Sequence, residues 1–182
     1  MKRITLSAIL AISFLTSFAQ NAGSSGAQTA DLNLSNALEI SFTDNSSSTI
    51  NVQFNSLSDM INGVETSTHE IRVRSNKKFK VTVKPSSNNF SYSGSSLIGT
   101  LLKVSTVMKI QVVNNNTGGN QPLSALLTGW QNFSVLGLPV TLLNNCNPGN
   151  NQTFTVKYKA TPGVNCVAGN YTTDMVYTAT QQ

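Results

Sequence analysis

The chain has 182 residues, a formal net charge of +5 and only 10% charged residues. This length gives one domain enough chain to bury a core. Asn, Ser, Thr and Gln dominate the polar residues, and the chain is poor in the residues that build long helices. Its composition therefore argues against a helical protein and favours an exported β-protein.

The first residues have the order of a secretory signal. Met1–Arg3 is basic, Ile4–Leu15 is an apolar run too short to span a bilayer, and Ser17–Ala19 provides small residues before a cut that precedes Gln20. We therefore expect residues 1–19 to be removed as a signal peptide. Export to the periplasm, the outer surface or the medium follows, with no membrane-spanning segment left after cleavage. Without this leader the net charge falls to about +3.

Residues 20–30 contain Gly, Ser, Ala and Asn but nothing to bury, so we expect a flexible tail ahead of one domain over residues 31–182. Two runs then alternate apolar and polar side chains, and they predict strands over Leu32–Phe42 and Thr49–Phe54. Ser56–Val64 breaks that alternation. It predicts one capped helical turn, with a plain loop as the alternative.

Glu70–Lys84 predicts a β-hairpin with Ser75–Lys77 at its turn and an apolar face made by alternate residues of both strands. The opposite face is basic, and we expect its side chains to project from the same side of two neighbouring strands: Arg72, Arg74, Lys78, Lys80 and Lys84. Such a patch is suited to an anionic glycan, lipopolysaccharide or an acidic partner. A solvated face that blocks edge pairing is the alternative.

The middle of the chain combines one regular and one irregular segment. Thr100–Val113 alternates over its length and predicts a long strand. Pro122–Leu143 is Leu-rich and irregular, so we expect it to be buried, with a strand near Val140–Leu143. Trp130 is the natural core anchor of this segment, although a sugar-binding aromatic is the other interpretation.

The last stretch, Gln152–Gln182, predicts a closing antiparallel hairpin. Two alternating runs rich in Thr, Val and Tyr flank a turn-rich segment, and Tyr171, Met175 and Tyr177 share one face of the second run. Cys146 and Cys166 lie in loops on either side of the first run. In an exported chain such a pair predicts a disulfide.

About seven to nine short strands with hardly a helix predict a β-sandwich, with a closed barrel as the alternative. The segments Ala168–Tyr171 and Tyr177–Thr180, preceded by Gln152–Val156, resemble the ending of bacterial β-sandwich surface proteins and fimbrial subunits, and Lys77–Val83 is similar in style. The resemblance implies an all-β, antiparallel Ig-like sandwich with a structural or adhesive role. It brings no catalytic residues.

Residues that carry catalytic or metal chemistry are sparse. His69 is the only histidine, the carboxylates are scattered, and no phosphate loop, nucleophile elbow or metal-binding spacing is present. We therefore expect no enzyme, cofactor, metal or nucleic-acid partner. The expected function is that of an exported cell-surface or fimbria-like subunit, with a secreted glycan-binding module as the alternative. In the first case, partners are further copies or other surface subunits, and Gln20–Ala30, running into Leu32 and Leu34, is the candidate donated strand.

Overall fold

The structure, a computed structural model, describes residues 32, 34–43, 49–95 and 101–182. Contacts divide the chain into two units, Met1–Leu34 and Ser35–Gln182. Of the first unit only Leu32 and Leu34 are described, and both side chains are exposed. The predicted signal peptide and the tail over residues 20–30 lie outside the described residues.

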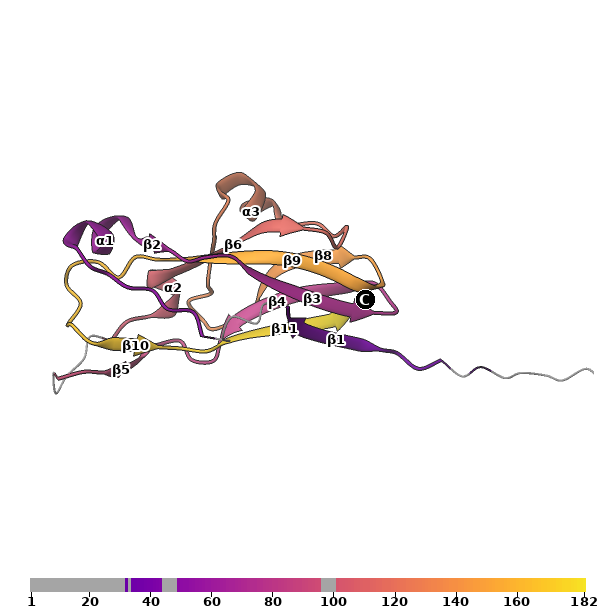
Figure 1. Ribbon diagram of the computed structural model, residues 1–182, viewed down its shortest axis with the longest axis horizontal. Helices are drawn as coiled ribbons and strands as arrows, with labels where there is room; N and C mark the ends of the chain where they lie inside the picture. The colour runs from indigo at the N-terminus through magenta and orange to yellow at the C-terminus, as the bar shows by residue number, and fades with distance from the viewer. Residues whose placement is uncertain (1–31, 33, 44–48, 96–100) are drawn as a thin grey trace, which may run out of the picture. The chain divides into compact units, whose positions relative to one another are not determined.

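The second unit is built from antiparallel sheets (Figure 1). The larger sheet has the strand order β1 (Leu38–Phe42), β3 (His69–Ser75), β9 (Gly149–Ala160), β6 (Met108–Asn115) and β7 (Gln131–Asn132), and β2 (Val64–Glu65) also pairs with β9. The smaller sheet has the order β11 (Met175–Gln181), β4 (Phe79–Pro85) and β8 (Val140–Cys146). A separate pair joins β10 (Asn170–Thr172) to β5 (Ser91–Ser93).

One apolar core lies between the two larger sheets. Alternate residues of β3, β4 and β9 are fully buried in it, including Ile71, Val81 and Phe154. Burial of each large apolar side chain contributes roughly 1.5–3 kcal/mol. The predicted antiparallel sandwich is therefore confirmed, although the described residues form eleven strands rather than seven to nine.

Neither predicted hairpin forms. β3 and β4 follow each other in the chain, but β3 belongs to the larger sheet and β4 to the smaller one. The same is true of β9 and β11, so the chain crosses between sheets at both places. The alternation of apolar and polar residues indicates which face of a strand is buried. The strands of both sheets have the same alternation, because both sheets bury their inner faces. The alternation does not indicate which strand is the partner.

Three short helices interrupt the strands: α1 (Leu57–Asn62), α2 (Val104–Val107) and α3 (Leu123–Thr128). The predicted helical turn is confirmed in α1, where Ser56 and Asp59 form a capping box. The long strand predicted over Thr100–Val113 is wrong in its first half. Val104 and Val107 are both buried at a helical spacing, and β6 starts only at Met108.

Candidate functional site

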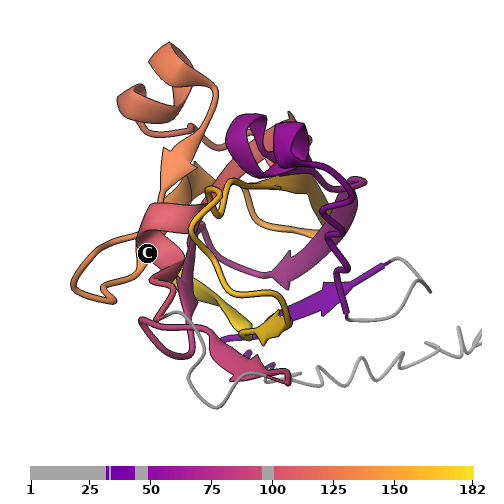
Figure 2. The same cartoon turned by 90° about the vertical axis from the view of Figure 1, so that its left-hand side faces the viewer.

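A cavity of about 1260 Å³ lies between the sheets at the end of the domain that carries β5 and β10. Figure 2 looks onto this end. The larger sheet contributes β1, β3, β6 and β9 to its wall. Further parts of the wall come from β10, β11, residues 49–55 and the loop between β9 and β10. Its aromatic lining comprises Phe42, Phe54, Phe90, Tyr158, Tyr171 and Tyr177. The volume exceeds the usual range of small-molecule sites, about 300–1,000 Å³.

The cavity is partly open to solvent, and polar as well as apolar side chains line it. The cavity must therefore contain water, or be filled by an apolar group that comes from elsewhere. Filling by an apolar group removes the lining from water and is the more stable outcome.

Residues 49–55 cover one side of the cavity as an extended segment, which we call the strap. Ile50, Val52 and Phe54 are half-buried and line the cavity, while Asn51 and Gln53 are exposed. This is the facing predicted for a strand over Thr49–Phe54. The strap nevertheless pairs with no strand among the residues that the structure describes. The strap therefore has the facing of a strand without being part of any sheet that the described residues form.

The smaller sheet has an incomplete edge beside the same cavity. β11 pairs with β4 on one side only. Near the C-terminus its other side is covered by β1, because the Gln181 amide donates to the Ala37 carbonyl at 2.9 Å. β1 pairs with β3 and not with β11. Towards Met175 and Thr173 the edge adjoins the cavity.

The strand order makes β11 an edge strand. The larger sheet runs β1-β3-β9-β6-β7, and the smaller sheet runs β11-β4-β8, with β8 on the other side of β4. Within the described part of the chain, no strand joins the smaller sheet on the far side of β11.

Two tyrosines from opposite sheets meet in the cavity wall. The hydroxyl groups of Tyr158 in β9 and Tyr177 in β11 are hydrogen-bonded to each other. The Phe42 ring packs edge-on against Tyr177, with 5.8 Å between the ring centres. Burial raises the pKa of Tyr158 to about 12, and burial together with the neighbouring Tyr158 raises the pKa of Tyr177. Both phenols are therefore neutral at physiological pH, and neither is suited to act as a base.

Two further polar side chains line the cavity. His69 lies on the inner face of β3, and Thr173 lies between β10 and β11. His69 Nε2 and Thr173 Oγ1 are buried without a hydrogen-bond partner. Within the described ranges, no group of three or more His, Cys, Asp or Glu side chains could hold a metal ion.

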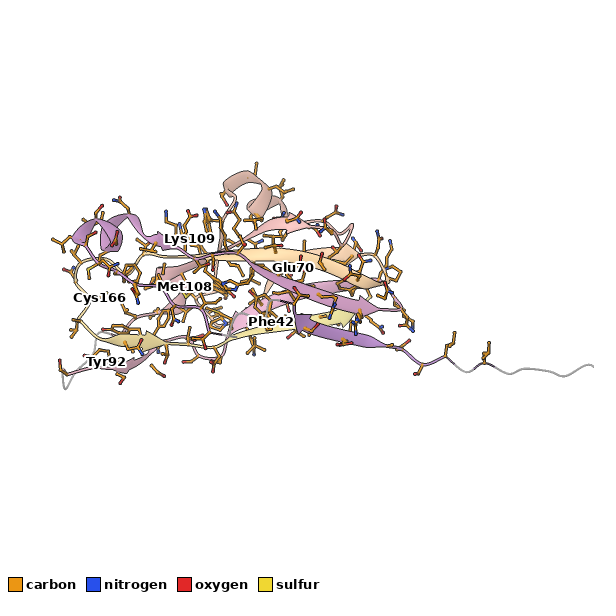
Figure 3. All side chains as sticks on the ribbon, viewed as in Figure 1. Phe42, Glu70, Tyr92, Met108, Lys109 and Cys166 are labelled. Atoms are coloured by element: carbon orange, nitrogen blue, oxygen red, sulfur yellow. The ribbon has the colours of Figure 1, made fainter. Side chains whose placement is uncertain are left out.

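The predicted disulfide between Cys146 and Cys166 is absent, and both thiols are free. Cys146 ends β8 in the main core, whereas Cys166 lies in the loop after β9 and donates to the Pro162 carbonyl at 3.0 Å. β9 separates them with 12 residues, or about 40 Å of extended chain. Figure 3 shows Cys166 at the end of the domain far from the C-terminus. A loop pairing was expected because the length of β9 was not recognised.

The predicted basic patch does not form one surface. Arg72 and Arg74 lie on the outer face of the larger sheet, and Arg74 pairs with Glu39 at 3.2 Å. Lys80 and Lys84 lie on the outer face of the smaller sheet, with the core between the two pairs, and Lys78 is in the connection. The outward orientation was predicted correctly. The patch is divided because β3 and β4 belong to different sheets.

The Leu-rich segment Pro122–Leu143 is wrongly predicted as buried. Only part of it is in the core, while Leu123, Leu126 and Leu127 in α3 are exposed. Trp130 is half-buried and is not in the core; the Lys157 ammonium lies 5.1 Å from its ring centre. Phe133 is the aromatic residue that the core receives from this segment. Phe133 and Trp130 are both aromatic residues within the same Leu-rich segment, so the sequence did not indicate which of them is buried.

No helix in the described ranges is long and apolar enough to cross a membrane. No known family model matches the chain, and no curated protein is similar to it.

Proposed function

We propose that this chain is an exported, non-enzymatic structural or adhesive subunit of the cell surface, and that copies assemble by strand donation. The observation that carries the proposal is the incomplete edge of β11 beside a large apolar cavity. A strand added to this edge would pair its backbone with β11 and direct every second side chain into the cavity. The cavity is then filled and the sheet is completed in one step.

The N-terminal segment of a second copy supplies a suitable strand. Its candidate residues run from Gln20 to Leu34, of which only Leu32 and Leu34 are described. These leucines are two residues apart, so they project from the same face of an extended chain. Their exposed fractions are 82% and 86%.

The gains and the costs of such an exchange are of similar size. Burial of each leucine contributes roughly 1.5–3 kcal/mol, and each new backbone hydrogen bond adds about 1 kcal/mol. The cost is the ordering of the donated segment, at about 1–2 kcal/mol per residue. A donated strand therefore needs both its apolar side chains and a well-matched cavity, and removal of either one should prevent assembly.

The test uses one variant that cannot donate and one that cannot accept. Deletion of residues 20–34 removes the donor, and Val52→Arg places a charge in the cavity wall. Each variant alone should remain monomeric in light scattering, while the full mature chain forms multimers. An equimolar mixture should form a heterodimer, because one partner retains the donor and the other the cavity. A mixture that stays monomeric, or a full mature chain that is monomeric at high concentration, contradicts the proposal.

A glycan-binding module has less support. The basic residues expected to form one anion-binding surface are divided between two sheets, and Arg74 already has a carboxylate partner. The half-buried Trp130 ring lies beside the Lys157 ammonium rather than in the cavity.

A further inference from the structure

Exposed apolar side chains lie on α3, away from the cavity. We call Leu123, Leu126 and Leu127 of this helix the leucine surface. Their exposed fractions range from 64% to 77%, and none of them lines the cavity. Their spacing of three and four residues places them on one side of the helix. Three large apolar side chains exposed on one six-residue helix mark an interaction surface rather than scattered surface residues.

The local structure explains why α3 presents its leucines outward. Ala125 is the one buried residue of this six-residue helix, so a small side chain makes the contact with the domain. Gly129 ends the helix in a left-handed conformation with a φ of 71°. In Figures 1 and 2, α3 stands away from the sheets. The leucines therefore meet solvent, or whatever binds there.

The surroundings of the leucine surface are basic. Lys109 in β6 is exposed opposite Asn132 of β7, and Lys157 lies against Trp130, which directly follows α3 and Gly129. From Ile71 to Thr173 the sequence contains no Asp or Glu, and this stretch holds every Lys and Arg except Lys2 and Arg3. Glu65 is bound by Lys157 at 2.7 Å. Lys109 has no salt bridge among the described residues.

Exposed leucines beside lysines favour one kind of partner over another. Pairing of two copies through the same surface would bring together their Lys109 side chains, which have no salt bridge to any described residue, while the nearby Glu65 is already bound by Lys157. An anionic lipid surface instead accepts leucines among its acyl chains and lysines at its phosphates, and Trp favours the boundary between the two. We propose that the leucine surface docks the domain onto an anionic lipid surface, independently of strand donation.

α1 provides a matched control within the same chain. It also has six residues, and it exposes Leu57 and Ile61. Its first turn carries Asp59, and it has no basic residue in its last turn. Apolar exposure is therefore shared by α1 and α3, but α1 carries a carboxylate and α3 does not. An anionic surface should bind through α3 and not through α1.

Trp130 allows a direct test because it is the only tryptophan of the chain. Vesicles of phosphatidylcholine and phosphatidylglycerol in equal parts should shift its emission to shorter wavelength, and added salt should reverse the effect. The monomeric variant that lacks residues 20–34 should bind equally well. Leu126→Ser should weaken vesicle binding about tenfold or more, and Lys109→Ser about fivefold. Leu57→Ser in α1 should leave binding unchanged.

Circular dichroism of each variant establishes that its fold is intact. Equal binding to pure phosphatidylcholine vesicles, or no emission change with the anionic vesicles, overturns the proposal. A similar loss for Leu57→Ser and Leu126→Ser also overturns it, because binding would then follow apolar exposure alone. If Leu126→Ser instead dissociates a dimer of the variant lacking residues 20–34, the occupant is a second copy and the lipid proposal fails.

Discussion

Tyr158 and Tyr177 connect the two sheets through a hydrogen bond between their hydroxyl groups. Burial favours the neutral phenols, so the pKa of Tyr158 rises from its usual value near 10 to about 12. Because the folded pKa is raised, the stabilisation is fully present below pH 10, where the Tyr158 hydroxyl is protonated in both the folded and the unfolded chain. The stabilisation is lost as pH rises from about 10 to about 12.

We therefore expect the free energy of unfolding to fall by about 2 kcal/mol between pH 10 and pH 12 from Tyr158 alone. Urea unfolding measured across this range tests the prediction. Other groups titrate there too, so the double variant Tyr158→Phe, Tyr177→Phe serves as the control. Its unfolding free energy should fall less steeply, and equal slopes for the two proteins would show that these hydroxyls carry no such linkage.

The two cysteines should differ in reactivity. Cys146 is fully buried in the core, whereas Cys166 is only half-buried in a loop, and burial raises the pKa of both thiols. Because thiolates are the reactive species and must be reached by the reagent, alkylation of the native protein without reductant should label Cys166 first. Peptide mass spectrometry over time reads out both sites. Protection of both thiols until a reductant is added would show that they are oxidised.

At the scale of elements, α1 tests how far local sequence determines structure. Ser56 Oγ accepts the Asp59 backbone N–H at 3.1 Å, and the Asp59 carboxylate accepts the Ser56 N–H at 3.0 Å. Ser56→Ala should therefore lower the free energy of unfolding by about 1 kcal/mol. Ser58→Ala, two residues further on in the same helix, is the matched control; it removes only an exposed hydrogen bond from Asn62 and should have a smaller effect. Equal effects in urea unfolding would mean that the cap contributes nothing.

β11 is the element on which the smaller sheet depends. It pairs with β4 over Met175–Gln181, and its inward side chains Met175, Tyr177 and Ala179 pack against the core. Deletion of Tyr171–Gln182 removes this packing, at roughly 1.5–3 kcal/mol for each large side chain, and exposes an edge of β4. The truncated protein should be unfolded or aggregated by circular dichroism and light scattering. A soluble, cooperatively folding truncation would show that the sheet does not need β11.

Elements were predictable where local signals determine them. The capping box indicated α1, and alternation gave the inward residues of β3, β4, β9 and β11. Pairing was not predictable, because an inward-facing residue looks the same in either sheet. Leu126 and Trp130 were predicted to be buried, but Leu126 is exposed and Trp130 is half-buried. The hydrophobicity of a side chain indicates how much free energy its burial would gain, but it does not indicate whether the fold buries that position.

At the scale of the whole molecule, the sandwich follows from composition and alternation, but the candidate site does not. The cavity depends on the spacing between β11 and the strap, and no local pattern in the sequence reports that spacing. The sequence did mark both components of the proposed assembly. Val52 was predicted in an alternating run, and Leu32 and Leu34 were identified as a candidate donor.

Direct contact between the donor of one copy and the cavity of another is the central claim. Leu34→Cys and Val52→Cys, introduced together into a chain that also carries Cys166→Ser, place one thiol on each component. Copies labelled with ¹⁵N are mixed with unlabelled copies, allowed to assemble, oxidised and digested. We predict a disulfide-linked peptide pair that joins Cys at 34 from one copy to Cys at 52 from the other, with mixed isotope labels. Linked pairs that carry only one label throughout, or no linkage between these positions, would contradict strand donation.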